Sequence, residues 1–126
     1  MPNNNGSVIC IVDDDAAVRS ALKFALELEG LKVRLYDGAQ AMLGDEDLPQ
    51  RGCLVVDYRM PHMDGLQLVD ALRARDVRFP TIMITGRANK DLRRMAERSG
   101  VSDVLEKPLP DGALVDSIRS ALGAPG

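Results

Sequence analysis

The sequence predicts an α/β fold: one domain built around a central parallel sheet. Three observations support this prediction. The length of 126 residues suits a single domain, the hydrophobic fraction of 45% is enough to bury a full core, and short β-branched runs alternate with stretches of helical periodicity. Such alternation is typical of successive strand–helix units, whose strands pair in parallel. General disorder and a disulfide-stapled miniprotein are both excluded by the same composition.

The first unit joins the apolar run VICIV, residues 8–12, to a helix over residues 18–28 in which apolar side chains recur at helical spacing. Gly30 stands where the end of this helix is expected. The second unit is a strand over residues 31–36 followed by a short, weakly patterned helix over residues 38–43.

The third unit follows a loop over residues 44–52 that is rich in charge, Gly and Pro. The run CLVVD, residues 53–57, is expected to form a buried strand, and a turn-rich loop comes next. Leu66, Val69 and Leu72 then form the apolar stripe of the third helix.

The fourth unit begins after Pro80 with the strand TIMIT, residues 81–85. Leu92, Met95 and Ala96 are expected to form the inward stripe of its helix. In the fifth unit, VSDVLEKP (residues 101–108) is a strand and its exit. The helix after it is predicted from four apolar residues: Leu114, Val115, Ile118 and Leu122.

Composition restricts the location and partners of the protein. A net charge of -3 and an aromatic fraction of 3% argue against binding nucleic acid by electrostatic capture or base stacking. No apolar run approaches the ~20 residues that span a bilayer, and the first residues lack the features of a secretory signal. We therefore expect a cytoplasmic protein with no direct contact to nucleic acid or membrane. Cys10 and Cys53 lie in apolar runs and are expected to be buried thiols.

Polar side chains stand where four of the predicted strands end. Asp13 and Asp14 follow the first strand, Asp57 ends the third, Thr85 ends the fourth, and the fifth leads into Lys107. Because the carboxyl ends of parallel strands meet at one edge, where open α/β sheets bind ligands, these side chains are expected to converge.

Crowded carboxylates repel one another, so they raise a pKa or recruit a cation. Oxygen ligands without His or Cys suit a hard ion, which we expect to be Mg²⁺, with Mn²⁺ as the alternative. Such an ion leaves coordination positions open for a phosphoryl group. Asp57 would then be the attacking oxygen, Lys107 would offset charge, and Thr85 would donate a hydrogen bond. Asp15 has a simpler interpretation as a helix N-cap.

Four motifs in order (IVDDD, VVDYRMPHMDG, ITG and EKP) make the chain resemble the receiver domain of two-component response regulators, from Val8 to Leu122. Within that family it is most similar to the FixJ-type regulators, by V-D-D-D-x-x-V-R-x-x-L, D-x-R-M-P and M-I-T-G. The resemblance implies a single flavodoxin-like (βα)5 domain, with strand order 2-1-3-4-5 and helices on both faces of the sheet.

The resemblance also implies roles for individual residues. Asp57 would be the phosphoacceptor, and Asp14 would ligate Mg²⁺ together with Asp57 itself, with Asp13 helping directly or through water. The backbone carbonyl of Arg59 would be a further ligand.

Thr85 would be the switch hydroxyl, and Lys107 would pair with the phosphoacceptor, oriented by a Lys107–Pro108 peptide that is usually cis in the family. Arg59 and Arg87 would flank the phosphoryl group. We expect these two arginines either to cover that group or to pair with nearby carboxylates such as Asp64 in the resting state.

Two positions depart from the family pattern: Val104, and Leu109 after Pro108, where an aromatic is common. Val104 stands where an aromatic ring usually rotates between two states, and a β-branched valine is stiff and small. A ring swing is therefore excluded as the readout. Either Thr85 and movement of the loop and fourth helix carry the switch, or the signal is weaker.

The resemblance implies a sensor histidine kinase as phosphoryl donor. It further implies a signalling surface formed by the fourth helix, fifth strand and fifth helix, which binds a downstream effector protein or a second copy. We expect a signalling switch with Mg-dependent autophosphorylation and autodephosphorylation only, and not a conventional enzyme. Residues 7–123 would be the receiver domain, residues 1–6 a disordered tail and residues 124–126 a C-terminal tail, with no output domain.

Three alternatives stay open at this point. An aspartyl-phosphate phosphohydrolase places a second Asp two residues after the nucleophile, where this chain has Arg59. A flavodoxin-like cofactor binder needs a phosphate loop after the first strand, where three aspartates would repel phosphate. A degenerate receiver that signals without phosphate is disfavoured by the full set of Asp57, Thr85 and Lys107.

Overall fold

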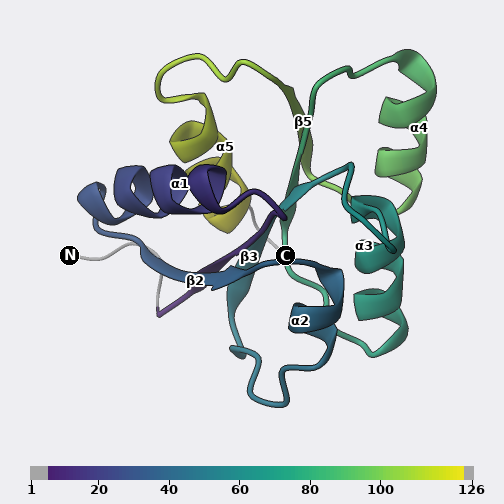
Figure 1. Ribbon diagram of the computed structural model, residues 1–126, viewed down its shortest axis with the longest axis horizontal. Helices are drawn as coiled ribbons and strands as arrows, with labels where there is room; N and C mark the ends of the chain where they lie inside the picture. Colours follow the sequence, from purple (N-terminus) through teal and green to yellow (C-terminus); the bar gives the residue numbers. More distant parts are fainter. Residues whose placement is uncertain (1–5, 124–126) are drawn as a thin grey trace.

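The computed structural model describes residues 6–123, in which five strands alternate with five helices (Figure 1). The elements are β1 (Val8–Val12), α1 (Ala16–Leu28), β2 (Lys32–Tyr36), α2 (Ala39–Leu43), β3 (Gly52–Asp57), α3 (Gly65–Ala74), β4 (Thr81–Thr85), α4 (Lys90–Arg98), β5 (Asp103–Glu106) and α5 (Ala113–Gly123). Of the two expected tails, residues 1–5 and 124–126 lie outside the described residues.

The strands form one parallel sheet in the order β2-β1-β3-β4-β5. This confirms the predicted α/β fold and its strand order. Every residue of β3, at the centre of the sheet, is buried. A strand covered on both faces must be apolar along its whole length, which explains the unbroken run CLVV before Asp57.

Helices cover both faces of the sheet: α1 and α5 lie on one face, and α2, α3 and α4 on the other (Figure 1). Alternate residues of each strand point to opposite faces. On the α1/α5 face, strand residues such as Ile11 and Ile84 pack with Leu26 of α1 and Ile118 of α5. The opposite face has its own cluster, which includes Val12, Val56, Met83, Leu68 and Leu92.

The inward stripe expected for α4 is wrong at one residue. In α1, for which only helical spacing was predicted, the buried residue is Leu26, and Leu28 is 71% exposed. In α4, Leu92 and Ala96 are buried but Met95 is 43% exposed. The three apolar residues of α4 form a single stripe, and helical spacing alone does not say which edge of that stripe lies outside the contact with the sheet.

Residues 101–108, expected to be a strand and its exit, contain a strand of 4 residues. The backbone N–H of Val101 donates to the carbonyl of Ala96 at 2.9 Å, so it closes the end of α4 and is not available to the sheet. At the other end, Pro108 has no N–H to pair. The strand therefore spans only Asp103–Glu106.

Both cysteines are buried and unpaired, as predicted. Burial raises the pKa of Cys10 to about 11 and that of Cys53 to about 12, so both remain protonated core thiols. Among residues 6–123, no helix combines the length and apolar character needed to cross a membrane.

Candidate functional site

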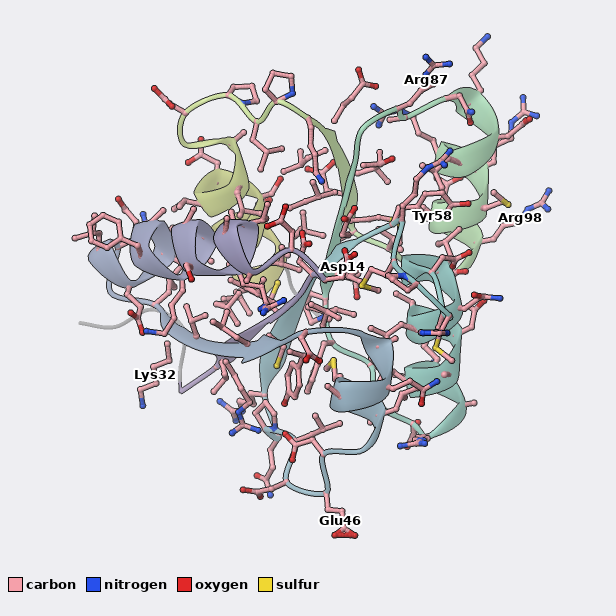
Figure 2. The ribbon with its side chains drawn as sticks, viewed as in Figure 1. Asp14, Lys32, Glu46, Tyr58, Arg87 and Arg98 are labelled. Carbon is pink, nitrogen blue, oxygen red and sulfur yellow. The ribbon has the colours of Figure 1, made fainter. Side chains whose placement is uncertain are left out.

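Three carboxylates meet where β1 and β3 end. Asp13 and Asp14 follow β1, and Asp57 is the last residue of β3. One oxygen of each carboxylate lies within 4.8 Å of the others. Figure 2 shows Asp14 near the middle of the view, where the chain passes from β1 to α1. The convergence predicted from the sequence is therefore present.

The turn after β1 is fixed by its own aspartates. Asp13 Oδ1 accepts a hydrogen bond from the backbone N–H of Asp15 at 2.9 Å. Asp15 caps α1, accepting from the N–H groups of Ala17 and Val18 at 2.9 and 3.3 Å, as expected for an N-cap. Arg19 donates to the Asp13 carbonyl at 2.7 Å. These bonds hold Asp13 against the sheet edge and leave Asp14 exposed.

Lys107 reaches the cluster from the exit of β5. Its Nζ lies 3.6 Å from Asp57 Oδ2. Its backbone N–H donates to the Thr85 carbonyl at 2.8 Å, which extends the β4–β5 pairing by one residue. The Lys107–Pro108 peptide is cis, as the family resemblance implies. Lys107 is the only side-chain cation paired with Asp57 among residues 6–123.

The site holds more negative charge than Lys107 offsets. Burial is the main cause that raises the pKa of Asp57, and Asp13 and Asp14 add to it, while Lys107 and the Arg59 amide act in the opposite direction. Burial also raises the pKa of Asp13. Asp13 and Asp57 are 3% and 9% exposed, so water screens their repulsion poorly. A set of oxygen donors with unbalanced negative charge fits a hard divalent cation.

Thr85 is buried, and its hydroxyl is engaged by the loop that follows β4. Its Oγ1 donates to the carbonyl of Arg87 at 3.2 Å and accepts from the Arg87 N–H at 3.3 Å. In the sheet, Asp57 pairs with Ile84, so Thr85 stands one residue beyond Asp57 on the neighbouring strand.

Comparison with known proteins identifies the family. Residues 9–119 match the response regulator receiver domain. The chain belongs to this family. It is therefore the receiver domain of a two-component response regulator, a signalling domain.

Relatives of this receiver domain include two transcriptional regulatory proteins FixJ. That of Azorhizobium caulinodans is 42% identical over 114 residues, which cover 90% of this chain and 54% of that protein. That of Bradyrhizobium diazoefficiens is 40% identical, covering 90% of this chain and 56% of that protein. The chain thus spans about half the length of these curated relatives.

Solved structures agree with the fold. The crystal structure of FixJ-N superposes with a TM-score of 0.85 at 32% identity, covering 100% of this chain and 99% of that one. The chemotaxis protein CheY4 of Vibrio cholerae has a TM-score of 0.84 at 20% identity, with 91% of this chain and 98% of that one covered, and supports the fold alone.

The two arginines expected beside the phosphoryl site are exposed, and neither forms an ion pair with any residue from 6 to 123. Figure 2 shows Arg87 extending outward near the start of α4. Asp64, the expected resting partner, instead caps α3: its Oδ1 accepts from the Gln67 N–H at 2.8 Å, and Gln67 Oε1 accepts from the Asp64 N–H at 2.9 Å. The expected pairing with Asp64 is absent.

Gly65 is a positioning residue that the sequence reasoning did not single out. A Cβ at this position would lie 2.8 Å from the Asp57 carbonyl oxygen and 3.1 Å from the Tyr58 Cα. Its N–H donates to the Tyr58 carbonyl at 2.8 Å. The first turn of α3 therefore packs directly behind Asp57, and only glycine permits that approach. The final Gly of the motif MDG was the available signal.

Val104, at the position of the usual aromatic switch, is partly buried and packs with the α2/α3/α4 cluster. Its carbonyl accepts a hydrogen bond from Arg93 of α4 at 3.4 Å. At this position, therefore, the side chain of Val104 is packed in the core and its backbone carbonyl is hydrogen-bonded to α4.

Removing one crowded carboxylate should stabilise the metal-free protein. Because the pKa of Asp13 is raised on folding, the folded state binds more protons than the unfolded state above the ordinary pKa of the carboxyl, and stability falls as pH rises through that window. We expect Asp13→Asn to raise Tm at pH 7 in a chelator by roughly 4 °C, which corresponds to about 1 kcal/mol for a domain of this size. The difference should disappear in acid.

The control is Asp70→Asn, which changes an exposed carboxylate on α3. Thermal unfolding followed by circular dichroism at several pH values makes the comparison. An Asp13→Asn protein that melts at or below the wild-type Tm at pH 7 would contradict the electrostatic description.

Proposed function

We propose that this receiver domain is a phosphorylation switch in which Asp57 accepts the phosphoryl group of a sensor kinase phosphohistidine. The observation that supports the proposal is the nearly buried Asp57 carboxylate beside Asp13, Asp14 and Lys107. A buried carboxylate among like charges destabilises a fold, so a purely structural role gives no reason for the cluster.

The transfer is a substitution at phosphorus. A carboxylate oxygen of Asp57 attacks the phosphoryl group, an O–P bond forms, and the P–N bond to the kinase histidine breaks. The released imidazole takes up a proton, and Asp57 carries an acyl phosphate. Attack by water later restores the carboxylate and releases inorganic phosphate, so the domain ends its own signal.

The proposed cation site consists of the Asp13, Asp14 and Asp57 carboxylates and the backbone carbonyl of Arg59, for Mg²⁺ or, as the alternative, Mn²⁺. Such an ion supplies positive charge that offsets the charge of the phosphoryl oxygens. Lys107, 3.6 Å from Asp57, supplies a fixed charge on the same group.

The proposed response begins at Thr85. Its hydroxyl leaves the Arg87 carbonyl and donates to a phosphoryl oxygen, and the loop after β4 moves with it. The change reaches the α4–β5–α5 surface without any aromatic swing at Val104. The exposed basic residues of α4 are Lys90, Arg93, Arg94 and Arg98. Acidic residues near β5 and α5 are Asp103, Glu106, Asp111 and Asp116.

This charge pattern suits a downstream effector protein or a second copy as partner. Residues 7–123 would form the receiver domain and act in the cytoplasm, without direct contact to nucleic acid or membrane.

Replacing Asp57 should abolish phosphorylation. We expect wild-type protein incubated with acetyl phosphate and Mg²⁺ to gain one phosphoryl group by intact mass, and Asp57→Asn to gain none, because the amide is not a nucleophile. Asp70→Asn, an exposed acid on α3, is the matched control and should behave as wild type. An equal adduct on Asp57→Asn, or none on any protein, would overturn the proposal.

Arg59 and Arg87 are proposed to cover the phosphoryl group and slow its hydrolysis. Because neither is committed to an ion pair within residues 6–123, both are available to do so. We expect the double variant Arg59→Ala, Arg87→Ala to lose its phosphoryl group several-fold faster once acetyl phosphate is removed. Unchanged decay of the intact-mass adduct would remove this role.

A further inference from the structure

Glu106 links the end of β5 to the loop that precedes α4. Its Oε1 accepts a hydrogen bond from the backbone N–H of Ala88 at 2.8 Å, although the two residues are 18 positions apart in the chain. Glu106 is the last residue of β5 and pairs with Thr85 in the sheet. The bond therefore joins the loop to the same part of the sheet from which Thr85 projects.

The segment that Glu106 holds is the one that engages the Thr85 hydroxyl. Thr85 Oγ1 bonds to both backbone groups of Arg87, and Ala88 is the next residue. Asn89 then caps α4, with its Oδ1 accepting from the Leu92 N–H at 2.8 Å. The Ala88 N–H precedes the cap, so no helical carbonyl serves it, and Glu106 provides its acceptor.

We propose that Glu106 is a positioning residue that stabilises the resting arrangement of the loop after β4. This inference rests on the proposed function, since it concerns the movement of Thr85 toward a phosphoryl group. In the proposed response the loop after β4 moves together with the Thr85 hydroxyl, and this movement includes the Arg87–Ala88 segment. A shift that breaks the bond from Ala88 to Glu106 costs the free energy of that bond.

The hydrogen bond between Glu106 and Ala88 would shift the equilibrium between the resting and active states. A bond made only in the resting state lowers the population of the active state, and the apparent affinity for any activating ligand falls by the same factor. A typical hydrogen bond contributes about 1 kcal/mol, which corresponds to about fivefold in affinity. Glu106 would then contribute to the free energy that phosphorylation has to supply to populate the active state.

The role depends on an acceptor oxygen and not on charge. Glu106→Gln keeps Oε1 and removes the charge, whereas Glu106→Ala removes both. Glu97→Ala is the matched control, because Glu97 is an exposed acid of α4 whose side chain has no hydrogen-bond partner among residues 6–123. Glu106 is itself exposed, so these substitutions leave the core intact.

The test is a titration of the full chain with beryllofluoride, a phosphoryl mimic, in saturating Mg²⁺, followed by amide NMR. We expect Glu106→Ala to bind about fivefold more tightly than wild type, and Glu106→Gln and Glu97→Ala to stay within twofold. In the unliganded state, the Ala88 amide should exchange with solvent faster in Glu106→Ala alone.

Asp57→Asn separates failure of this inference from failure of the proposed function. If Asp57→Asn binds beryllofluoride as tightly as wild type, the proposed function is wrong. If it does not bind, but Glu106→Ala has wild-type affinity, only the role of Glu106 is refuted. If Glu106→Gln behaves like Glu106→Ala, the effect is one of charge, and the hydrogen-bond account is overturned.

Discussion

Repulsion between carboxylates at the ends of two adjacent strands is the constraint on which the rest of this site depends. β1 and β3 are neighbours in the sheet, and Val12 pairs with Val56, so the residues that follow, Asp13 and Asp57, are brought side by side. Both are nearly buried, and the described structure gives them one ammonium, that of Lys107. Such a site has unbalanced negative charge at rest, and its oxygen donors fit a hard divalent cation.

The surrounding structure holds this arrangement in place. Asp15 and Asp64 cap the two helices that leave the site, and Gly65 lets α3 begin directly behind Asp57. The carboxylates therefore cannot relieve their repulsion simply by moving apart. In contrast, the loop after β4 is held chiefly by the side-chain hydrogen bonds of Thr85 and of the exposed Glu106. Fixed acids beside a more weakly held loop are what a switch of this kind requires.

Sequence patterns predicted the sheet and the convergence of Asp13, Asp14, Asp57 and Lys107 at its edge, because both depend on local signals. Buried strands are apolar runs, and their ends are marked by charged residues that topology then brings together. The hydrogen bond between Glu106 and Ala88 was not predicted, because the two residues are 18 positions apart in the chain and the bond depends on the conformation of the Glu106 side chain. The exposure of Met95 was missed for a related reason: helical spacing fixes a periodicity but not the angle at which a helix meets the sheet. Asp45 Oδ2 also accepts hydrogen bonds from Arg34 at 3.2 Å and from the Tyr36 hydroxyl at 2.6 Å, and these contacts between separate segments were likewise not predicted.

The central claim is that a cation relieves the repulsion among these aspartates, and its most direct test is the Mg²⁺ dependence of thermal stability. Wild type and Asp14→Asn would be melted at pH 7 across a Mg²⁺ titration at constant ionic strength. The account predicts that wild-type stability rises with Mg²⁺, by ~2.7 kcal/mol at a hundred times the dissociation constant, and that Asp14→Asn gains much less. A wild-type Tm that does not respond to Mg²⁺, or an equal rise in Asp14→Asn, would contradict it.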